Sequence, residues 1–453
     1  MDYTAEIFDQ IQLLFAITGF NDHQLHCVLR FGAKLDAAAL EKAVACSIEA
    51  IPILGTRYID GGKPHWASID PDNFGKAFSI TQTEIEFEQL LVSRVDESIG
   101  PQIKVCLLDS SPSAVALTMN HMVCDAAGFK EYLYFLCKIY SGMITDPGYR
   151  PTAIDGDRSI RRVLKRIGIG VKLMSLLSQN RENNRSGDHR FPLSRDGEVQ
   201  PFILTHRIGR ERTAALRGYS QASGATLNDV VLTSYYRCLF RRLSFIPGTE
   251  LCIPVMVDMR RYLGEAERLN TLTNLSSTVI TRLEYRPEED FEAMLGRVKA
   301  VMDEKKSSNL GINAFIKLDL AYRLLGNKRA NYQLRSSLKN PLICMTNVGI
   351  LDSARMSFGD LYPCNAFLCG SIKYKPHFQL AMSSYEGELT LSSNLYGNAD
   401  DRDRILAFLD EIEKELLAGI NISFFSAQKS DIANESCNRT PGSNHFIMRI
   451  NRI

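Results

Sequence analysis

The chain has 453 residues, which is too long for one ordinary hydrophobic core and long enough for two domains of about 200 residues each. Its composition, 45% hydrophobic and 23% charged, is typical of a globular protein. Its net charge of +1 provides no overall attraction to nucleic acid or to an anionic membrane, so we expect no nucleic-acid partner.

Periodic apolar residues predict alternating strands and helices in the first 140 residues. A helix is expected to begin at Asp36, a residue type that caps helices well, and to end before Pro52. The other predicted elements are strands at His26–Phe31, Ile103–Leu108 and Ala114–Met119 and helices at Glu86–Ser98 and Gly128–Tyr140.

The composition changes between residues 141 and 200, where Gly, Pro, Asp, Arg and Asn become frequent and 181–188 is expected to be a loop. We interpret this region as a crossover between domains. It contains a predicted basic helix, Ser159–Leu177, whose positive residues between 158 and 172 alternate with apolar ones. Such a helix can lie on an anionic membrane or receive an acidic carrier protein, but a solvated helix face is the simpler interpretation.

The second half repeats the same alternation and adds a strand-rich end. Strands are predicted at Phe202–Ile208, Leu251–Val257, Leu342–Asn347, Asn365–Ser371, His377–Ser384 and Glu388–Leu395, and helices from near Glu211 and at Thr226–Phe240, Glu289–Asp303, Ile312–Leu325 and Arg402–Leu417. The last two strands are expected to form a hairpin across a turn at 385–387. We predict two α/β (α+β) domains, 1–180 with the crossover and 181–425, and a disordered tail at 426–453.

The eleven cysteines are odd in number, lie mostly in apolar runs and include no C-x-x-C pair. The first residues lack a basic segment followed by an apolar one, and no apolar stretch approaches the about 20 residues that span a bilayer. We therefore expect a cytoplasmic protein without a transmembrane segment, and a monomer.

One segment, 118–129, combines residue types that can carry chemistry. His121 stands where an apolar strand ends, and Asp125 stands where a helix begins. The H-x-x-x-D spacing alone is weak in a chain with eight histidines, and Asp125 also suits a plain helix cap. However, side chains at such junctions often open into crevices, and a neutral imidazole accepts protons near pH 7.

This segment resembles the H-H-x-x-x-D-G motif of the superfamily of chloramphenicol acetyltransferase and nonribosomal condensation domains. Further similar segments follow in the family's order and extend over roughly residues 5 to 420. They are Phe8-Asp9-Gln10, residues 35–54, Thr226 to Val231, Pro254 to Leu263 around Arg260, Asn274 to Ser277, and Thr346 to Gly349. The chain looks most similar to free-standing, alcohol-acetyltransferase-like bacterial and archaeal members.

The resemblance implies two chloramphenicol-acetyltransferase-like domains packed in a V, with an active-site tunnel between them. An acyl-CoA or phosphopantetheine thioester would be the co-substrate, with no permanently bound cofactor and no metal. His121 would deprotonate the acceptor, and Asp125 would form a structural ion pair with Arg260. Residues expected at the substrate are Asn120, Ala126, Gly128, Ser276, Asn347 and Gly349.

The chain departs from the family pattern beside the histidine. Asn120 replaces the first histidine of the doublet, and Ala126 replaces the glycine after the aspartate. Alanine disfavours positive φ, so a tight turn there would need the freedom of Gly128. The D-F-G-W-G motif of plant acyltransferases is absent, and Asn347-Val348-Gly349 occupies a comparable place.

Three functions follow as hypotheses. The first is transfer of an acyl group from CoA to a small-molecule alcohol or amine. The second is condensation with an acyl carrier protein that acts in trans, and the third is a binding protein without catalytic activity. A metal site at His23 and His26, which form an H-x-x-H pair, is disfavoured.

Overall fold

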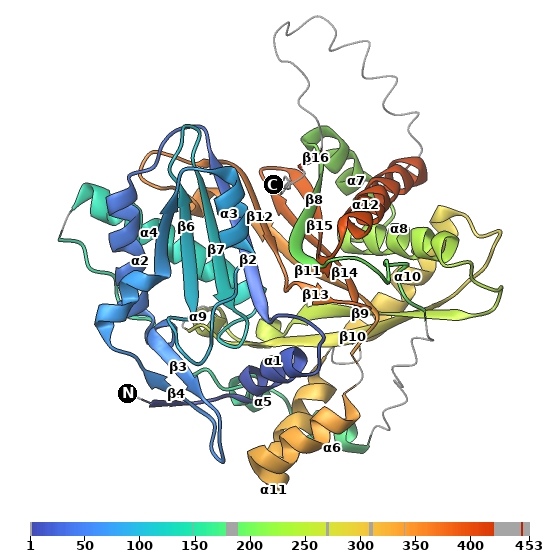
Figure 1. The fold of residues 1–453 in the computed structure, drawn as a ribbon. Helices are drawn as coiled ribbons and strands as arrows, with labels where there is room; N and C mark the ends of the chain where they lie inside the picture. Colours follow the sequence, from blue (N-terminus) through green and yellow to red (C-terminus); the bar gives the residue numbers. More distant parts are fainter. Residues whose placement is uncertain are drawn as a thin grey trace, which may run out of the picture.

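The computed structural model describes residues 2–146, 148–177, 189–268, 271–307, 311–338, 340–420 and 445–446. Two large sheets lie side by side, each covered by helices, and a small third sheet lies below the first (Figure 1). The mixed α/β class predicted from the sequence is therefore confirmed. The expected loop at 181–188 and all but two residues of the expected tail lie outside the described residues.

The first sheet has five strands in the order β12-β2-β7-β6-β5. They are β12 (Pro363–Cys369), β2 (Gln24–Phe31), β7 (Ala114–Asn120), β6 (Ile103–Leu108) and β5 (Phe78–Thr81). All neighbours are antiparallel except β5 and β6. β7 is buried along its whole length, so its apolar residues form the centre of this half.

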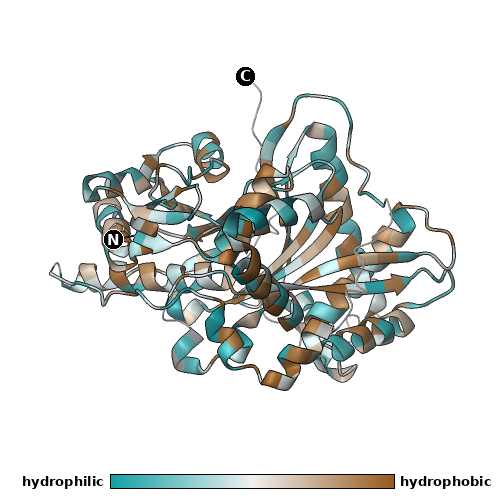
Figure 2. Ribbon diagram, turned by 90° about the horizontal axis from the view of Figure 1, so that it is seen from below, coloured by the Kyte–Doolittle hydropathy of each residue, from teal (hydrophilic) through white to brown (hydrophobic). Residues whose placement is uncertain are grey.

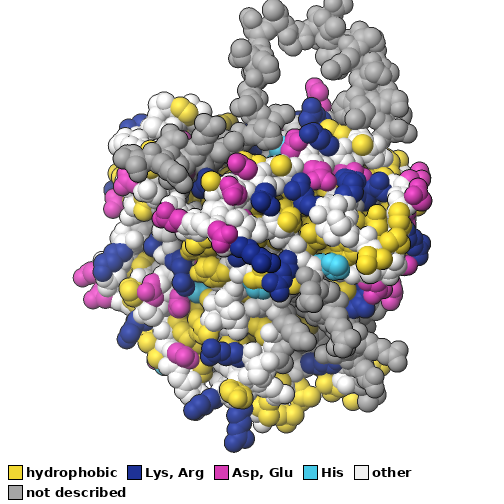
Figure 3. All heavy atoms as spheres, turned by 45° about the vertical axis from the view of Figure 1, so that its right-hand side comes forward, with side chains coloured by type: hydrophobic (Ala, Val, Ile, Leu, Met, Phe, Trp, Pro, Cys, Tyr) yellow, Lys and Arg dark blue, Asp and Glu magenta, His cyan; other side chains and the backbone are white. Residues whose placement is uncertain are grey.

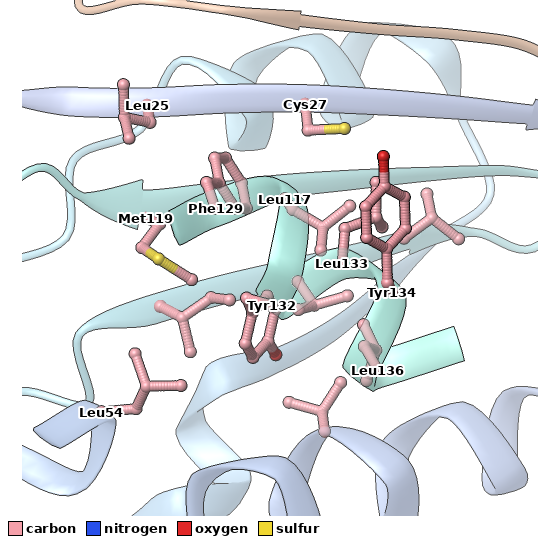
Figure 4. Close-up of a cluster of buried hydrophobic side chains, with 14 of the residues drawn as sticks. Leu25, Cys27, Leu54, Leu117, Met119, Phe129, Tyr132, Leu133, Tyr134 and Leu136 are labelled. Atoms are coloured by element: carbon pink, nitrogen blue, oxygen red, sulfur yellow. The ribbon is translucent and has the colours of Figure 1, made fainter. Parts of the chain in front are cut away.

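Helices cover both faces of this sheet. On one face, α4 (Ala126–Thr145) packs against α2 (Ala37–Ala50), which Asp36 caps as predicted. Figure 4 shows the resulting core between α4 and the strands. The other face contacts α3 (Glu84–Leu91).

The predicted helix Glu86–Ser98 was too long, because α3 ends at Leu91. The side chain of Gln24 explains the early end. Its Oε1 accepts from the N–H of Val95 and its Nε2 donates to the carbonyl of Val95, both at 3.3 Å. These two bonds hold the chain after Leu91 in an extended course.

The second sheet has the strand order β10-β9-β11-β14-β15-β8-β16, and β13 pairs with β15. Its strands are β8 (Gln200–Ile208), β9 (Glu250–Asp258), β10 (Ser276–Glu284), β11 (Ile343–Leu351), β13 (Lys373–Tyr374), β14 (Phe378–Tyr385), β15 (Glu388–Gly397) and β16 (His445–Phe446). Its helices are α7 (Arg210–Ala222), α8 (Leu227–Arg242), α10 (Phe291–Ser307) and α12 (Ala399–Gly419). The helices in Figure 2 carry both hydrophilic and hydrophobic residues, as expected of helices that pack on a sheet with one face.

The hairpin predicted at 385–387 is confirmed, since Tyr385 pairs with Glu388 across a two-residue turn. Glu386 and Gly387 both have positive φ, 48° and 79°. That conformation belongs to a type I′ turn, whose twist matches the twist of the flanking strands.

The chain crosses between the two halves late in the sequence. β12, which follows β11 of the second sheet, pairs with β2 and so completes the edge of the first sheet. A single domain boundary near residue 180 does not account for β12, which lies in the second half of the chain but belongs to the first sheet. The division into domains 1–180 and 181–425 stays a prediction.

Several short elements lie outside these layers. They are β1 (Asp2–Thr4), β3 (Thr56–Ile59) and β4 (His65–Ser68) of the small sheet, α1 (Ile7–Ile17), α5 (Arg161–Lys165), α6 (Ile169–Leu177), α9 (Glu265–Arg268) and α11 (Ile312–Ser337), which is kinked at Gly326. α1 lies between the two halves and packs on α11 (Figure 1). No helix within the described ranges is long and apolar enough to cross a bilayer.

The predicted basic helix Ser159–Leu177 was wrong, because the segment forms α5 and α6 with a break before Ile169. Its charges also face inward more than expected. Arg158 and Arg162 are less than one-tenth exposed, and Arg166 pairs with Glu267 at 2.9 Å. Two of the six basic residues between 158 and 172 are therefore buried, while Arg161, Lys165 and Arg166 stay exposed, and Arg161 and Arg166 form ion pairs within the chain. Elsewhere, positive and negative side chains are interspersed on the face shown in Figure 3.

Arg158 ties four parts of the chain together. Its guanidinium binds both oxygens of Asp9 on α1, at 2.9 and 3.0 Å, and donates to the carbonyls of Val123 and Leu272. The indole N–H of Trp66 donates to the same carboxylate at 2.9 Å. A bidentate, fully hydrogen-bonded pair is the arrangement in which a buried ion pair is stable.

We expect Arg158→Met to lower the free energy of unfolding by about 3–5 kcal/mol, because it leaves the Asp9 carboxylate buried without its cation. Urea unfolding measures the change. Adding Asp9→Asn should recover part of the loss, since no uncompensated charge then remains. The matched variant Arg161→Met removes a half-exposed arginine that pairs with Asp319, and should cost less than about 1 kcal/mol. Equal losses in Arg158→Met and Arg161→Met would contradict this account.

Candidate active site

A cavity of about 390 Å³ lies between the two sheets. Its floor includes the junction of β7 and α4, and its walls come from α1, β9, β10, β11 and α11. Four residues that the sequence singled out line it: His121, Asp125, Ala126 and Ser276. The rest of the lining is mainly apolar, as is usual for small-molecule sites.

His121 is the first residue after β7, and the turn that follows is fixed by backbone bonds. Its N–H donates to the carbonyl of His23 at 2.8 Å. Asn120 is fully buried, accepts from the N–H of Met122 at 2.9 Å and donates to Gln102 at 2.7 Å. Asn120 is therefore not among the residues that line the cavity, and its expected contact with substrate stays a prediction. It shapes the turn that presents His121.

The imidazole of His121 is held in one tautomer. Its Nδ1 lies 2.9 Å from the carbonyl oxygen of Cys124 and 3.2 Å from Oδ1 of Asn274. The Asn274 amide is oriented by its Nδ2, which donates to the carbonyls of His121 and Met122. Both neighbours of Nδ1 are therefore acceptors, so Nδ1 carries the proton and Nε2 keeps a free lone pair.

The surroundings of His121 keep the ring neutral. Burial lowers the pKa of the imidazole below its ordinary value, and the nearby charge of Asp125 only partly counteracts this. At neutral pH the residue is therefore a neutral imidazole that can accept a proton at Nε2.

Asp125 binds donors from both halves of the molecule. Oδ1 accepts from the N–H of Gly128 at 3.0 Å and so caps α4. Oδ2 accepts from Nη1 of Arg260 at 2.8 Å, from the N–H of Leu275 at 2.7 Å and from the hydroxyl of Ser276 at 3.0 Å. Burial acts against ionisation, but Arg260 and these donors hold the pKa of Asp125 below its ordinary value.

The structure thus brings Asp125 and Arg260 together as the resemblance implies, and Ser276 joins them. Arg260 also donates to the carbonyl of Thr273 at 2.8 Å, so the pair fixes the start of β10. Ser276 lines the cavity while its hydroxyl is committed to Asp125.

Of the two residues Ala126 and Gly128, which were both expected at the substrate, only Ala126 lines the cavity. Ala126 is the first residue of α4 and is not among the described residues with positive φ, so no tight turn depends on a glycine there. Ala126 is part of the cavity lining. Gly128 is also helical and does not line the cavity; a Cβ there would lie 2.9 Å from Cβ of Cys124. Close packing, not positive φ, requires this glycine.

Asn347 and Gly349 are not among the residues that line the cavity, and their expected substrate contacts stay predictions. The alternation of side chains along β11 turns Thr346 and Val348 to the cavity instead. Asn347 bonds to Asn228 at 3.2 Å and accepts from the N–H of Gly349, which has a φ of 83° at a bulge.

The histidines of the H-x-x-H pair have separate partners. His23 bonds through Nε2 to Glu97 at 3.2 Å, and His26 bonds through Nδ1 to the carbonyl of Leu91 at 2.9 Å. Both rings are fully buried and serve these contacts.

No family model matches the chain, and no curated protein matches it. Solved structures do match over nearly the whole length. Trichothecene 15-O-acetyltransferase from Fusarium sporotrichioides has a TM-score of 0.68 at 14% identity, and covers 92% of this chain and 94% of its own. The fold is that of the condensation and acetyltransferase domains.

Two further structures have the same fold. The first condensation domain of the calcium-dependent antibiotic synthetase has a TM-score of 0.66 at 17% identity, and covers 92% of this chain and 96% of its own. Polyketide synthase associated protein 5 from Mycobacterium tuberculosis has a TM-score of 0.65 at 15% identity, and covers 90% and 96%. The condensation-domain fold expected from the resemblance is confirmed, while the alcohol-acetyltransferase-like subgroup stays a prediction.

We expect Asp125→Asn to lower the free energy of unfolding at pH 7 by about 3–5 kcal/mol, because Arg260 is left buried without its partner. A carboxylate with a depressed pKa stabilises the fold above the ordinary Asp value of about 3.9. That contribution disappears as pH falls through the lower, folded-state pKa. The difference between wild type and variant should therefore be constant above about pH 5 and shrink in stronger acid.

Chemical denaturation at a series of pH values measures this difference. Asp258→Asn is the matched control, since Asp258 contacts the same Arg260 at 3.2 Å with a side chain that is half exposed. It should cost less than about 1 kcal/mol. Identical pH profiles for wild type and Asp125→Asn would show that the ion pair does not stabilise the fold.

Proposed function

We propose that the protein transfers an acyl group from a CoA thioester to a hydroxyl or amine of a small molecule, with His121 as general base. The observation that carries this proposal is the neutral imidazole, whose Nδ1 is fixed by Cys124 and Asn274 while the ring lines the cavity. The shared fold with an acetyltransferase and with condensation domains supports it.

The reaction requires one general base that can reach the proton of the acceptor. Nε2 of His121 takes the proton of the acceptor as its oxygen or nitrogen attacks the thioester carbonyl. The new C–O or C–N bond forms, the C–S bond breaks, and the imidazolium returns its proton to the leaving thiolate. Asp125 and Arg260 are positioning residues in this scheme. They hold the turn that follows His121 against the start of β10.

The lining of the cavity suits an acyl chain. Apolar side chains of α1 and α11 form one end of it. They include Phe8, Ile11, Phe15, Leu318, Leu334 and Leu338. Burial of methylene groups there would contribute about 0.8 kcal/mol each, which favours a chain over a bare acetyl group.

The donor is tested by offering a panel of acyl-CoA thioesters with a crude metabolite extract and identifying new acylated products by mass spectrometry. A parallel reaction with acylated carrier protein tests the alternative donor. Products from the CoA panel support the proposal. Products from the carrier alone would move the assignment to a condensation reaction in trans.

We expect His121→Ala to lower the rate of thiol release by about 10²–10⁴-fold, the usual contribution of a positioned base. The fold should persist, because only two partly buried ring contacts are lost. His65→Ala is the matched control, since His65 bonds to the carbonyl of Lys63 on the small sheet and does not line the cavity. Equal turnover by wild type and His121→Ala would instead favour a binding protein without catalytic activity.

The pH dependence of kcat/KM should report the same group. Because burial lowers the pKa of His121, activity should persist below pH 6.5 and fall only when the ring becomes protonated in stronger acid. Initial rates measured from about pH 4.5 to 8 locate the acid limb of the profile, where kcat/KM falls. A limb with an apparent pKa above 7 would contradict the assignment of His121 as the base.

A further inference from the structure

A group of polar residues also lines the cavity. They are Ser371 on the loop that precedes β13, Lys373 on β13 and Gln379 on β14. The resemblance gave no role to any of these residues. Together they place an amine, a hydroxyl and an amide in one part of a cavity that also contains His121.

Lys373 is a buried cation without an anion. Its side chain is 3% exposed, and within the described part of the chain it makes no hydrogen bond and no ion pair. Its ammonium lies 3.9 Å from the centre of the Phe20 ring, which also lines the cavity. A cation–π contact offsets only part of the cost of burying a charge.

The nearest acidic group does not neutralise Lys373. Asp22 is fully buried and accepts from the N–H groups of Gln24 and Ile372, at 3.2 and 3.0 Å. Burial raises the pKa of Asp22 to about 7, so at neutral pH it carries only part of a negative charge. It lies close enough for its charge to act on Lys373 but forms no ion pair with it among the described residues.

Two neutral neighbours are also unpartnered. The hydroxyl of Ser371 and the amide of Gln379 make no hydrogen bond to any residue that the structure describes. Ser371 is 4% exposed, so its hydroxyl faces the cavity rather than bulk solvent. Groups of this kind, buried and unpaired, carry a cost that a bound ligand removes.

We propose that Lys373, with Ser371 and Gln379, forms a carboxylate-binding subsite for one of the two reactants. A carboxylate accepts several hydrogen bonds and supplies the charge that the buried ammonium lacks. The apolar end of the same cavity then holds the aliphatic part of that reactant. The substrate class is an aliphatic carboxylate, carried on the acyl group or on the acceptor. This assignment to a reactant rests on the proposed acyl transfer, whereas the binding itself does not.

The first test is binding, which requires no turnover. Octanoate and octan-1-ol are titrated into the purified protein by calorimetry. We expect wild type to prefer octanoate, and Lys373→Met to lose at least about tenfold in octanoate affinity with little change for octan-1-ol. Lys373→Arg should keep the preference. Lys104→Met, which removes a lysine that bonds to the Arg94 carbonyl outside the cavity, should bind as wild type does.

The melting temperature distinguishes a ligand site from a structural lysine. Without ligand, Lys373→Met should melt at or above the temperature of wild type, because an unpaired buried charge is removed. A marked fall would mean that Lys373 neutralises Asp22 in the fold, and would overturn the proposal. Equal octanoate affinity in wild type and Lys373→Met would overturn it as well. Gln379→Leu offers a second variant, with an expected smaller loss of octanoate affinity.

Turnover then assigns the carboxylate to a reactant. The donor pair is glutaryl-CoA and valeryl-CoA, and the acceptor pair is 8-hydroxyoctanoate and octan-1-ol. A preference for the charged member of one pair that Lys373→Met abolishes identifies that reactant. Transfer without such a preference in either pair would overturn the assignment to a reactant. If octanoate binds but no acyl transfer occurs, the carboxylate-binding subsite is supported and the proposed reaction is refuted.

Discussion

The buried carboxylate of Asp125 is the interaction on which the candidate site depends. It receives hydrogen bonds from the start of α4, from Arg260 and from the first residues of β10. These donors come from both sides of the cavity, so one side chain sets the distance between the two sheets where they approach His121. Arg260 and Asp125 are each almost fully buried, and such a pair is stable only when its remaining hydrogen-bonding positions are also filled. Here they are, by Gly128, Leu275, Ser276 and the carbonyl of Thr273.

A second buried pair supports the same turn from the other side. Arg158 binds Asp9 and also donates to the carbonyl of Val123, two residues before Asp125. It donates as well to the carbonyl of Leu272, just before Asn274. Both the turn that carries His121 and the segment that orients its ring are therefore held by charged side chains. A general base gains from such support because small displacements cost catalytic rate.

The sequence allowed the ion pair of Asp125 with Arg260 and the position of His121 at the cavity to be predicted, but not the residues that orient the imidazole. His121 and Arg260 follow strongly apolar strands and Asp125 caps a helix, so both local pattern and family resemblance are informative there. Asn274 follows a polar stretch without periodicity, and its contact with His121 spans 153 positions in the chain. The residues of β12 predicted a strand, but no pattern within that segment indicates that it joins the first sheet. The motif on β11 could not be resolved from the sequence into its two faces, of which Thr346 and Val348 line the cavity and Asn347 and Gly349 do not.

The polar groups around the cavity divide into two kinds. Those of Asp125, Arg260, Ser276 and Asn274 have their partners within the protein, and they define the geometry. Those of Lys373, Ser371 and Gln379 lack partners among the described residues, and they all face the same enclosed space. A buried cation without an ion-pair partner destabilises a fold, and the contact of Lys373 with Phe20 requires no charge, because a methionine would pack there equally well. Polar groups that have partners explain how the site is built, whereas a lysine without a partner is explained by what the site binds.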